Sequence, residues 1–266
     1  MSMTAIADVR TIAAALVEAR RQRVALPMFP GGVPDTLDAA YAIQRCAIEE
    51  WGDTIAGWKV GRLDASSSER YGVDRFIGPV FERDVVRAGD GETSLFPIVP
   101  GGSGAFEAEL VAIADVDQPV RIARWTIEGA TELVGSIHIG IEMAGSSVAN
   151  IAALPSTGSI AAFGNNSGQI IGPIISLAPG PLLDDVIVSS SVHGRVVRTA
   201  AASVLPGGPM TAFKFALDQL QALGMPLRKG QFVSTGAVTG MHQVTEGQCW
   251  EAVFQRHGRL VCRIVV

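Results

Sequence analysis

Two glutamates separated by a single residue lie in an otherwise apolar run, Ala105 to Val111. Side chains alternate between the two faces of a β-strand, so Glu107 and Glu109 point to the same side if this run is a strand. Two carboxylates on one face repel each other unless a cation lies between them. The alternative is a solvated strand face, because Glu-x-Glu pairs also occur on the exposed side of antiparallel sheets.

A third carboxylate follows in a second strand-like run, Ser136 to Met143. Isoleucines alternate through this run, which leaves His138, Gly140 and Glu142 on the other face. Three carboxylates and water molecules match the oxygen ligands that Mg²⁺ or Mn²⁺ prefers. Spacing alone does not bring Glu142 to the first pair, and His138 fits a hydrogen-bonded core histidine better than a fourth ligand.

Lys59 is the candidate cation, and it lies in the short β-prone run Gly57-Trp58-Lys59-Val60-Gly61. The apolar neighbours Trp58 and Val60 indicate that the ammonium is held inward. The alternative is a surface lysine at a strand end, with its aliphatic stem lying on apolar surface.

Two helices near the N-terminus precede the strands that must position these residues. Apolar residues recur at helical spacing from Ile6 to Val17. After a Pro/Gly-rich stretch from Pro27 to Pro34, a second helix capped by Asp35 or Thr36 extends to Trp51. The sequence therefore predicts a small helical N-terminal region over residues 1–80.

Short β-prone runs, punctuated by glycine and proline, dominate past Gly78. Helical patterns interrupt them at Thr126 to Val134 and at Thr211 to Leu223. The sequence contains neither GxGxxG nor GxxxxGK[ST], so a nucleotide-binding fold has no support. We expect a β-rich, metal-binding catalytic domain over residues 81–266.

Composition excludes several classes of protein. Hydrophobic residues make up 48% and charged residues 18% of the 266 residues, as in ordinary globular proteins. The net charge of -5 gives no basic stripe for nucleic acid. The three cysteines are scattered and no secretion signal is visible, which predicts a cytoplasmic protein without disulfides. Polar residues interrupt the apolar region from Ile151 to Leu183, so we expect no membrane span there.

Five short segments, in this order, resemble one known family. They are Asp38-Ala39-Ala40-Tyr41-Ala42-Ile43-Gln44, Gly57-Trp58-Lys59-Val60-Gly61, Phe106-Glu107-Ala108-Glu109-Leu110, Ile141-Glu142 and Ser234-Thr235-Gly236-Ala237. They are spread over nearly the whole chain, and together they resemble the 2-oxopent-4-enoate hydratase and 4-oxalocrotonate decarboxylase family of the fumarylacetoacetate hydrolase superfamily.

The resemblance implies an α+β fold with a mostly β, roll-like catalytic domain after a small helical region. It implies Mg²⁺ or Mn²⁺ on Glu107, Glu109 and Glu142, and it makes Lys59 the active-site lysine. The turn that holds the substrate carboxylate corresponds to residues 234–236, which are Ser234, Thr235 and Gly236.

Departures from the family pattern affect the residues that select the reaction. Leu63-Asp64 replaces a Thr-Ser pair, Arg75-Phe76-Ile77-Gly78 replaces Pro-Asp-Phe-Gly, and Phe163-Gly164-Asn165-Asn166-Ser167-Gly168 replaces an Asp-Asn-Ala-Ser-Ser stretch. Two acids expected near the substrate are therefore missing, whereas the metal ligands are intact.

The resemblance implies a hydro-lyase that hydrates a small 2-hydroxydienoate or 2-oxoalkenoate. Decarboxylation of an oxalocrotonate-like acid, carbon–carbon hydrolysis of an acylpyruvate and a non-catalytic partner subunit remain alternatives, since fold does not fix activity. Members of the family are generally homo-oligomers, so we expect at least a dimer, with part of the apolar stretch Ile170 to Leu183 buried between subunits.

Overall fold

The N-terminal helices pack against each other and against the edge of a large sheet. The computed structural model describes residues 3–120, 123–177 and 181–266. Helices α1 (Met3–Gln22) and α2 (Leu37–Trp51) share a buried apolar cluster. Thr36 caps α2, because its hydroxyl accepts a hydrogen bond from the Ala39 backbone N–H at 3.2 Å. Both predicted helices are confirmed.

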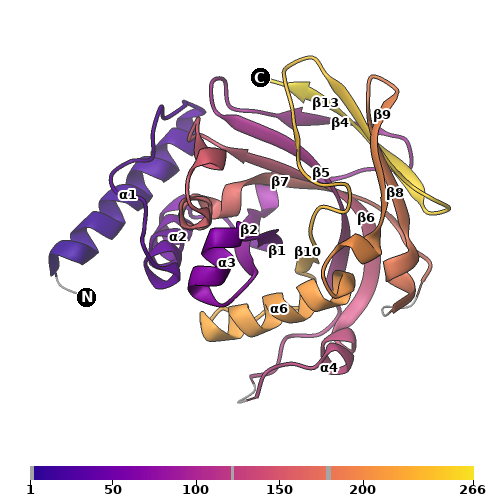
Figure 1. Ribbon diagram of the computed structural model, residues 1–266, viewed down its shortest axis with the longest axis horizontal. Coiled ribbons are helices and arrows are strands. Elements are labelled where there is room, and N and C mark those ends of the chain that lie inside the picture. Colours follow the sequence, from indigo (N-terminus) through magenta and orange to yellow (C-terminus); the bar gives the residue numbers. More distant parts are fainter. Residues whose placement is uncertain (1–2, 121–122, 178–180) are drawn as a thin grey trace.

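Strands from all parts of the chain form one curved eight-stranded sheet (Figure 1). Its order is β2 (Arg75–Phe81), β1 (Ile55–Arg62), β10 (Phe232–Ser234), β5 (Ser103–Ala114), β6 (Val134–Ser146), β7 (Asn166–Ile174) and β3 (Val85–Arg87), and β11 (His242–Gln243) pairs with β5. Residues 1–80 are therefore helical at their start, and they then supply β1 and most of β2 to this sheet.

A second sheet of five strands lies on the side of the molecule away from α1 and α2 (Figure 1). Its order is β4 (Thr93–Pro97), β13 (Gly258–Val265), β12 (Cys249–Phe254), β8 (Ile187–Val192) and β9 (Arg195–Ala201). The two sheets share one core, in which Phe106 of β5 stacks on Trp250 of β12 with ring centroids 5.0 Å apart.

The longest helix after α2 is α6 (Gly208–Ala222), which buries Phe213, Ala216, Leu217 and Leu220 in the shared core. It begins before the predicted start at Thr211. The other helical segments are short: α3 (Ala65–Tyr71), α4 (Ile127–Thr131), α5 (Ser156–Ala161), η1 (Glu82–Asp84), η2 (Ile151–Ala153), η3 (Phe163–Asn165), η4 (Pro181–Asp185) and η5 (Ala202–Val204). α4 is shorter than predicted, because Val134 instead begins β6 by pairing with Ala114.

The mixed α+β class predicted from the sequence is confirmed. The three cysteines are free, as predicted. In the described ranges no helix has both the length and the apolarity to cross a bilayer.

Much of the apolar stretch Ile170 to Leu183 is packed inside the chain. Ile170, Ile171, Ile175 and Leu183 are buried, whereas Ile174 and Leu182 are exposed. Residues 178–180 of this stretch lie outside the described residues. Intramolecular packing thus removes much of the reason to expect this stretch at a subunit interface, and the oligomer stays a prediction.

Candidate metal centre

Strands β5 and β6 bring the three predicted carboxylates together. They pair antiparallel with Glu107 directly opposite Glu142 and Glu109 opposite Gly140, so all three carboxylates lie on one face. One oxygen from each carboxylate lies within 4.8 Å of an oxygen of the other two. The sequence predicted the shared face of Glu107 and Glu109, and the register of β6 adds the third member.

Burial makes this cluster electrostatically costly. Glu109 and Glu142 are fully buried, and Glu107 is 8% exposed. Burial, followed by repulsion from Glu142 and Glu107, raises the pKa of Glu109 well above its ordinary value. Burial also raises the pKa of Glu142 to about 7, although the charge of Lys59 opposes this rise. The cluster therefore holds protons near neutral pH unless another cation replaces them.

Lys59 of β1 provides one positive charge at the cluster. Its Nζ lies 3.2 Å from Glu142 Oε1, and its side chain is 5% exposed. Burial lowers the pKa of Lys59, but the charges of the three glutamates outweigh burial and leave that pKa above its ordinary value. The surface-lysine alternative is therefore wrong, and the ammonium stays charged at neutral pH.

Hydrogen bonds orient two of the carboxylates. Glu109 Oε2 accepts from the Ser234 hydroxyl and, at 2.9 Å, from the Gly236 backbone N–H. Glu142 Oε1 accepts from Asn166 Nδ2 at 3.1 Å. The remaining oxygens, Glu109 Oε1 and Glu142 Oε2, are buried without a hydrogen-bond partner.

Two unpartnered carboxylate oxygens beside a third carboxylate fit a hard divalent cation. A buried polar atom without a partner costs about 1–3 kcal/mol, and more when it carries charge. Mg²⁺ and Mn²⁺ take oxygen ligands and leave positions for water or substrate. Glu107, Glu109 and Glu142 are therefore the residues that could hold such an ion.

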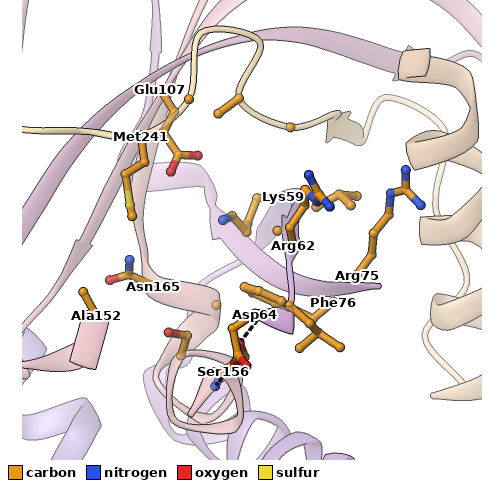
Figure 2. Close-up of a pocket in the computed structure, with 18 of the residues that line it drawn as sticks. Lys59, Arg62, Asp64, Arg75, Phe76, Glu107, Ala152, Ser156, Asn165 and Met241 are labelled. Carbon is orange, nitrogen blue, oxygen red and sulfur yellow. Dashed lines mark hydrogen bonds between the residues drawn. The ribbon is translucent and has the colours of Figure 1, made fainter. Parts of the chain in front are cut away.

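The cluster lies against a cavity of about 760 Å³. Lys59 and Glu107 line it, and Figure 2 shows both side chains directed toward its interior. The remaining lining includes both apolar and polar side chains: Leu63, Phe76, Leu154, Leu205, Met241, Ser156, Asn165 and Thr235. A small organic acid fits a cavity of this size and composition.

The predicted substrate turn, Ser234 to Gly236, lies beside the cluster, and its residues differ in what they contact. Ser234 is fully buried and donates to Glu109, so it holds a carboxylate of the cluster. Both the backbone N–H and the hydroxyl of Thr235 donate to the Leu110 carbonyl at 3.0 Å. Thr235 and Gly236 line the cavity, and their contact with substrate stays a prediction. His138 bonds Gly172 O at 2.8 Å, outside the cluster.

The sequence did not assign roles to Asn165 and Asn166, which follow a sharp turn at the cavity. Phe163 and Asn165 both have φ of 56°, and Gly164 has φ of 69°. The turn directs Asn165 into the cavity lining, where its Oδ1 has no hydrogen-bond partner, and it directs Asn166 to Glu142. The Gly-Asn-Asn sequence predicts a turn in this segment, but it does not indicate which residues the turn contacts.

No protein-family model matches the chain. The 2-keto-4-pentenoate hydratase of Paraburkholderia xenovorans (strain LB400) is 28% identical over 228 residues, which cover 82% of this chain and 80% of that protein. 4-Oxalocrotonate decarboxylase from Pseudomonas putida G7 has a similar structure, solved with calcium and acetate (TM-score 0.81, 19% identity, 97% and 98% of the two chains) and with magnesium and adipate (TM-score 0.80). Fumarylpyruvate hydrolase from Pseudomonas aeruginosa, in complex with Mn²⁺ and pyruvate, is more distant (TM-score 0.55, 21% identity, 79% and 88% of the chains).

Proposed function

We propose that this chain, which belongs to the fumarylacetoacetate hydrolase superfamily, is a divalent-metal-dependent lyase of small 2-oxo acids. One observation carries the proposal: a buried cluster of three glutamates with a charged lysine opens onto a cavity of about 760 Å³. The hydratase relatives support hydration of a 2-hydroxydienoate or 2-oxoalkenoate as the reaction.

The residues that would hold the ion are Glu107, Glu109 and Glu142. When bound there, Mg²⁺ or Mn²⁺ supplies Lewis-acid polarisation to an oxo acid that chelates it. Ser234 and Gly236 fix the orientation of Glu109, so the chain's own hydrogen bonds preorganise the ligand set. Glu107 is the ligand at the cavity wall and faces the space that a substrate would fill.

Lys59 has the properties of an anion partner. Its raised pKa keeps it protonated at neutral pH, so it is a poor general base and also a weak proton donor. In the cavity wall its ammonium can pair with the carboxylate of an oxo acid. This pairing places the reacting end of the substrate beside the glutamate cluster.

Decarboxylation of an oxalocrotonate-like acid is the second candidate. Among the described residues the carboxylates lining the cavity are Glu107 and Asp64. Three serine hydroxyls donate to Asp64 and lower its pKa, which leaves it a weak base for activating water. Phe76, which lines the cavity, stands at the position where the family carries an aspartate. Loss of CO₂ needs no activated water, so this lining is compatible with decarboxylation.

A panel of 2-oxo acids and 2-hydroxydienoates, incubated with Mg²⁺ or Mn²⁺, tests the proposal. Loss of ultraviolet absorbance without CO₂ identifies hydration, and loss with CO₂ identifies decarboxylation. Release of pyruvate from an acylpyruvate identifies carbon–carbon hydrolysis instead. If no acid of the panel reacts or binds in the presence of either metal, the proposal is wrong.

A further inference from the structure

A buried arginine of the N-terminal helix has no part in the proposed mechanism. Arg20 lies in the last turn of α1, and only 15% of its side chain is exposed. Its guanidinium carbon lies 5.1, 5.4 and 4.9 Å from the ring centroids of Trp51, Phe81 and Phe163. A charge enclosed by three aromatic rings has lost most of its water, so its remaining contacts must compensate for that loss.

The guanidinium donates to two acceptors where neighbouring strands begin. Its Nη2 donates to Asp84 Oδ2 at 2.8 Å, and Asp84 directly precedes β3. Its Nη1 donates at 2.8 Å to the backbone carbonyl of Asn166, the first residue of β7. Because β3 and β7 pair in parallel, one planar fork holds the starts of both strands.

Asn166 connects this fork to the glutamate cluster. Its side-chain amide donates to Glu142 Oε1 at 3.1 Å, and the same oxygen lies 3.2 Å from Lys59 Nζ. Arg20 therefore holds the backbone of the residue whose side chain orients one of the three carboxylates. The path from Arg20 to Glu142 runs through one residue and two hydrogen bonds, of 2.8 and 3.1 Å.

The turn before β7 needs contacts that hold its shape. Phe163 and Asn165 both have φ of 56°, a left-handed conformation that costs free energy for an L-residue. The Phe163 ring lies against the Arg20 guanidinium, and a Cβ built on Gly164 would lie 3.5 Å from Lys59 Cδ. The turn thus packs against both Arg20 and Lys59.

Attachment of α1 to the rest of the chain does not require this charge. Val9, Ala13, Leu16 and Val17 of α1 are buried in the apolar cluster shared with α2. An apolar side chain of similar volume at position 20 would extend that cluster without the cost of desolvating a charge. A lysine would keep the charge, but it lacks the planar fork that reaches two acceptors in fixed directions. The two acceptors therefore account for an arginine at this position.

We propose that Arg20 is a positioning residue of the metal centre, which acts through Asn166 on the orientation of Glu142. The inference rests on the proposed function, since it concerns the ion that the three glutamates would hold. Arg20 is not among the described residues that line the cavity, so its effect on metal affinity passes through the turn. Loss of the fork should leave the fold assembled and loosen one ligand.

A double-mutant cycle with Mn²⁺ as the probe tests this assignment. The four chains are the wild type, Arg20→Lys, Asn166→Ala and the double variant, each titrated with Mn²⁺ by calorimetry and melted without metal. Arg20→Lys keeps the charge beside Asp84 and removes the fork. If Arg20→Lys does not fold, Arg20→Met combined with Asp84→Asn takes its place, because that pair replaces the ion pair with neutral groups.

Val17→Ala is the matched stability control. Val17 is fully buried in the same helix, and its apolar side chain makes no hydrogen bond to the turn. This variant should melt at a lower temperature than the wild type because it leaves a cavity in the core. Its Mn²⁺ affinity should stay unchanged.

We expect Arg20→Lys to weaken Mn²⁺ binding about fivefold and Asn166→Ala to weaken it about tenfold. The double variant should bind like Asn166→Ala, because the path from Arg20 ends at the missing amide. Unchanged affinity in Arg20→Lys, an equal further loss on the Asn166→Ala background, or an equal loss in Val17→Ala overturns the inference and leaves the proposed function intact. Failure of the wild type to bind Mn²⁺ removes the proposed function and this inference with it.

Discussion

Gly164 lies in the turn before β7, at the point where this turn contacts β2. Replacing Gly164 with alanine tests whether that contact positions the wall of the cavity. A Cβ built on Gly164 lies 2.5 Å from the Cα of Gly78 and 3.2 Å from its backbone nitrogen. The contact is with backbone, so the turn itself must move. Overpacking of this kind costs about 1–3 kcal/mol, and the φ of +69° adds about 1–2 kcal/mol for an L-residue.

Gly72→Ala is the matched control. Gly72 has nearly the same φ, +67°, but a Cβ there meets no heavy atom within 4 Å. It therefore carries the conformational cost of about 1–2 kcal/mol without the steric one. The difference between the two variants isolates the steric cost, and we expect Gly164→Ala to unfold at a temperature about 2–10 °C below Gly72→Ala.

The displaced turn should also weaken metal binding. Asn166 follows Gly164 by two residues and donates to Glu142, so a shift of the turn disturbs one ligand of the cluster. Loss of such a bond is worth about 1–2 kcal/mol, or about tenfold in Kd. Chemical denaturation and calorimetric Mg²⁺ titration measure the two effects. Equal stability of the variants and unchanged metal affinity in Gly164→Ala would refute the packing argument.

Three further outcomes follow from the site and the assembly. Lys59→Met should lower kcat about 10²- to 10³-fold on a confirmed substrate, because a fixed charge beside the reacting acid is lost, and this loss should exceed any change in metal affinity; near-normal turnover would make Lys59 structural. The free energy of unfolding of the metal-free chain should fall by about 3 kcal/mol between pH 4.5 and pH 7, because unfolded Glu142 releases its proton near pH 4.5 and folded Glu142 near pH 7. The rise in melting temperature that Mg²⁺ causes should therefore grow over this window. A constant rise would contradict the pKa of Glu142. Light scattering at micromolar concentration should show at least a dimer, and a monomer would contradict the predicted assembly.

Local periodicity was enough to predict much of the fold and half of the geometry of the site. The alternation of residues 105–111 placed Glu107 and Glu109 on one face, and the helical spacing before Trp51 gave α1 and α2. The register that sets Glu142 opposite Glu107 is a contact across 35 positions, which local spacing does not encode. The resemblance to a family supplied that third carboxylate before the structure showed the convergence.

Other features depend on tertiary packing and had no local signal. Val134 continues a helical pattern in sequence, but pairing with Ala114 makes it the first residue of β6. Hydrophobicity alone suggested a subunit interface for Ile170 to Leu183, whereas most of its described apolar side chains are buried within the chain.

Calorimetric titration of Mg²⁺ and Mn²⁺ into the wild-type chain and Glu109→Gln tests the central claim most directly. Glutamine keeps an oxygen to accept from Ser234 and Gly236, so the fold should persist while one anionic ligand is lost. Glu49→Gln is the control, because Glu49 is exposed on α2. We predict one ion per chain for the wild type and the control, and affinity at least tenfold weaker in Glu109→Gln, for a loss of about 1.4 kcal/mol or more. Absence of binding in the wild type, or equal affinity in Glu109→Gln, would contradict a metal centre at these three glutamates.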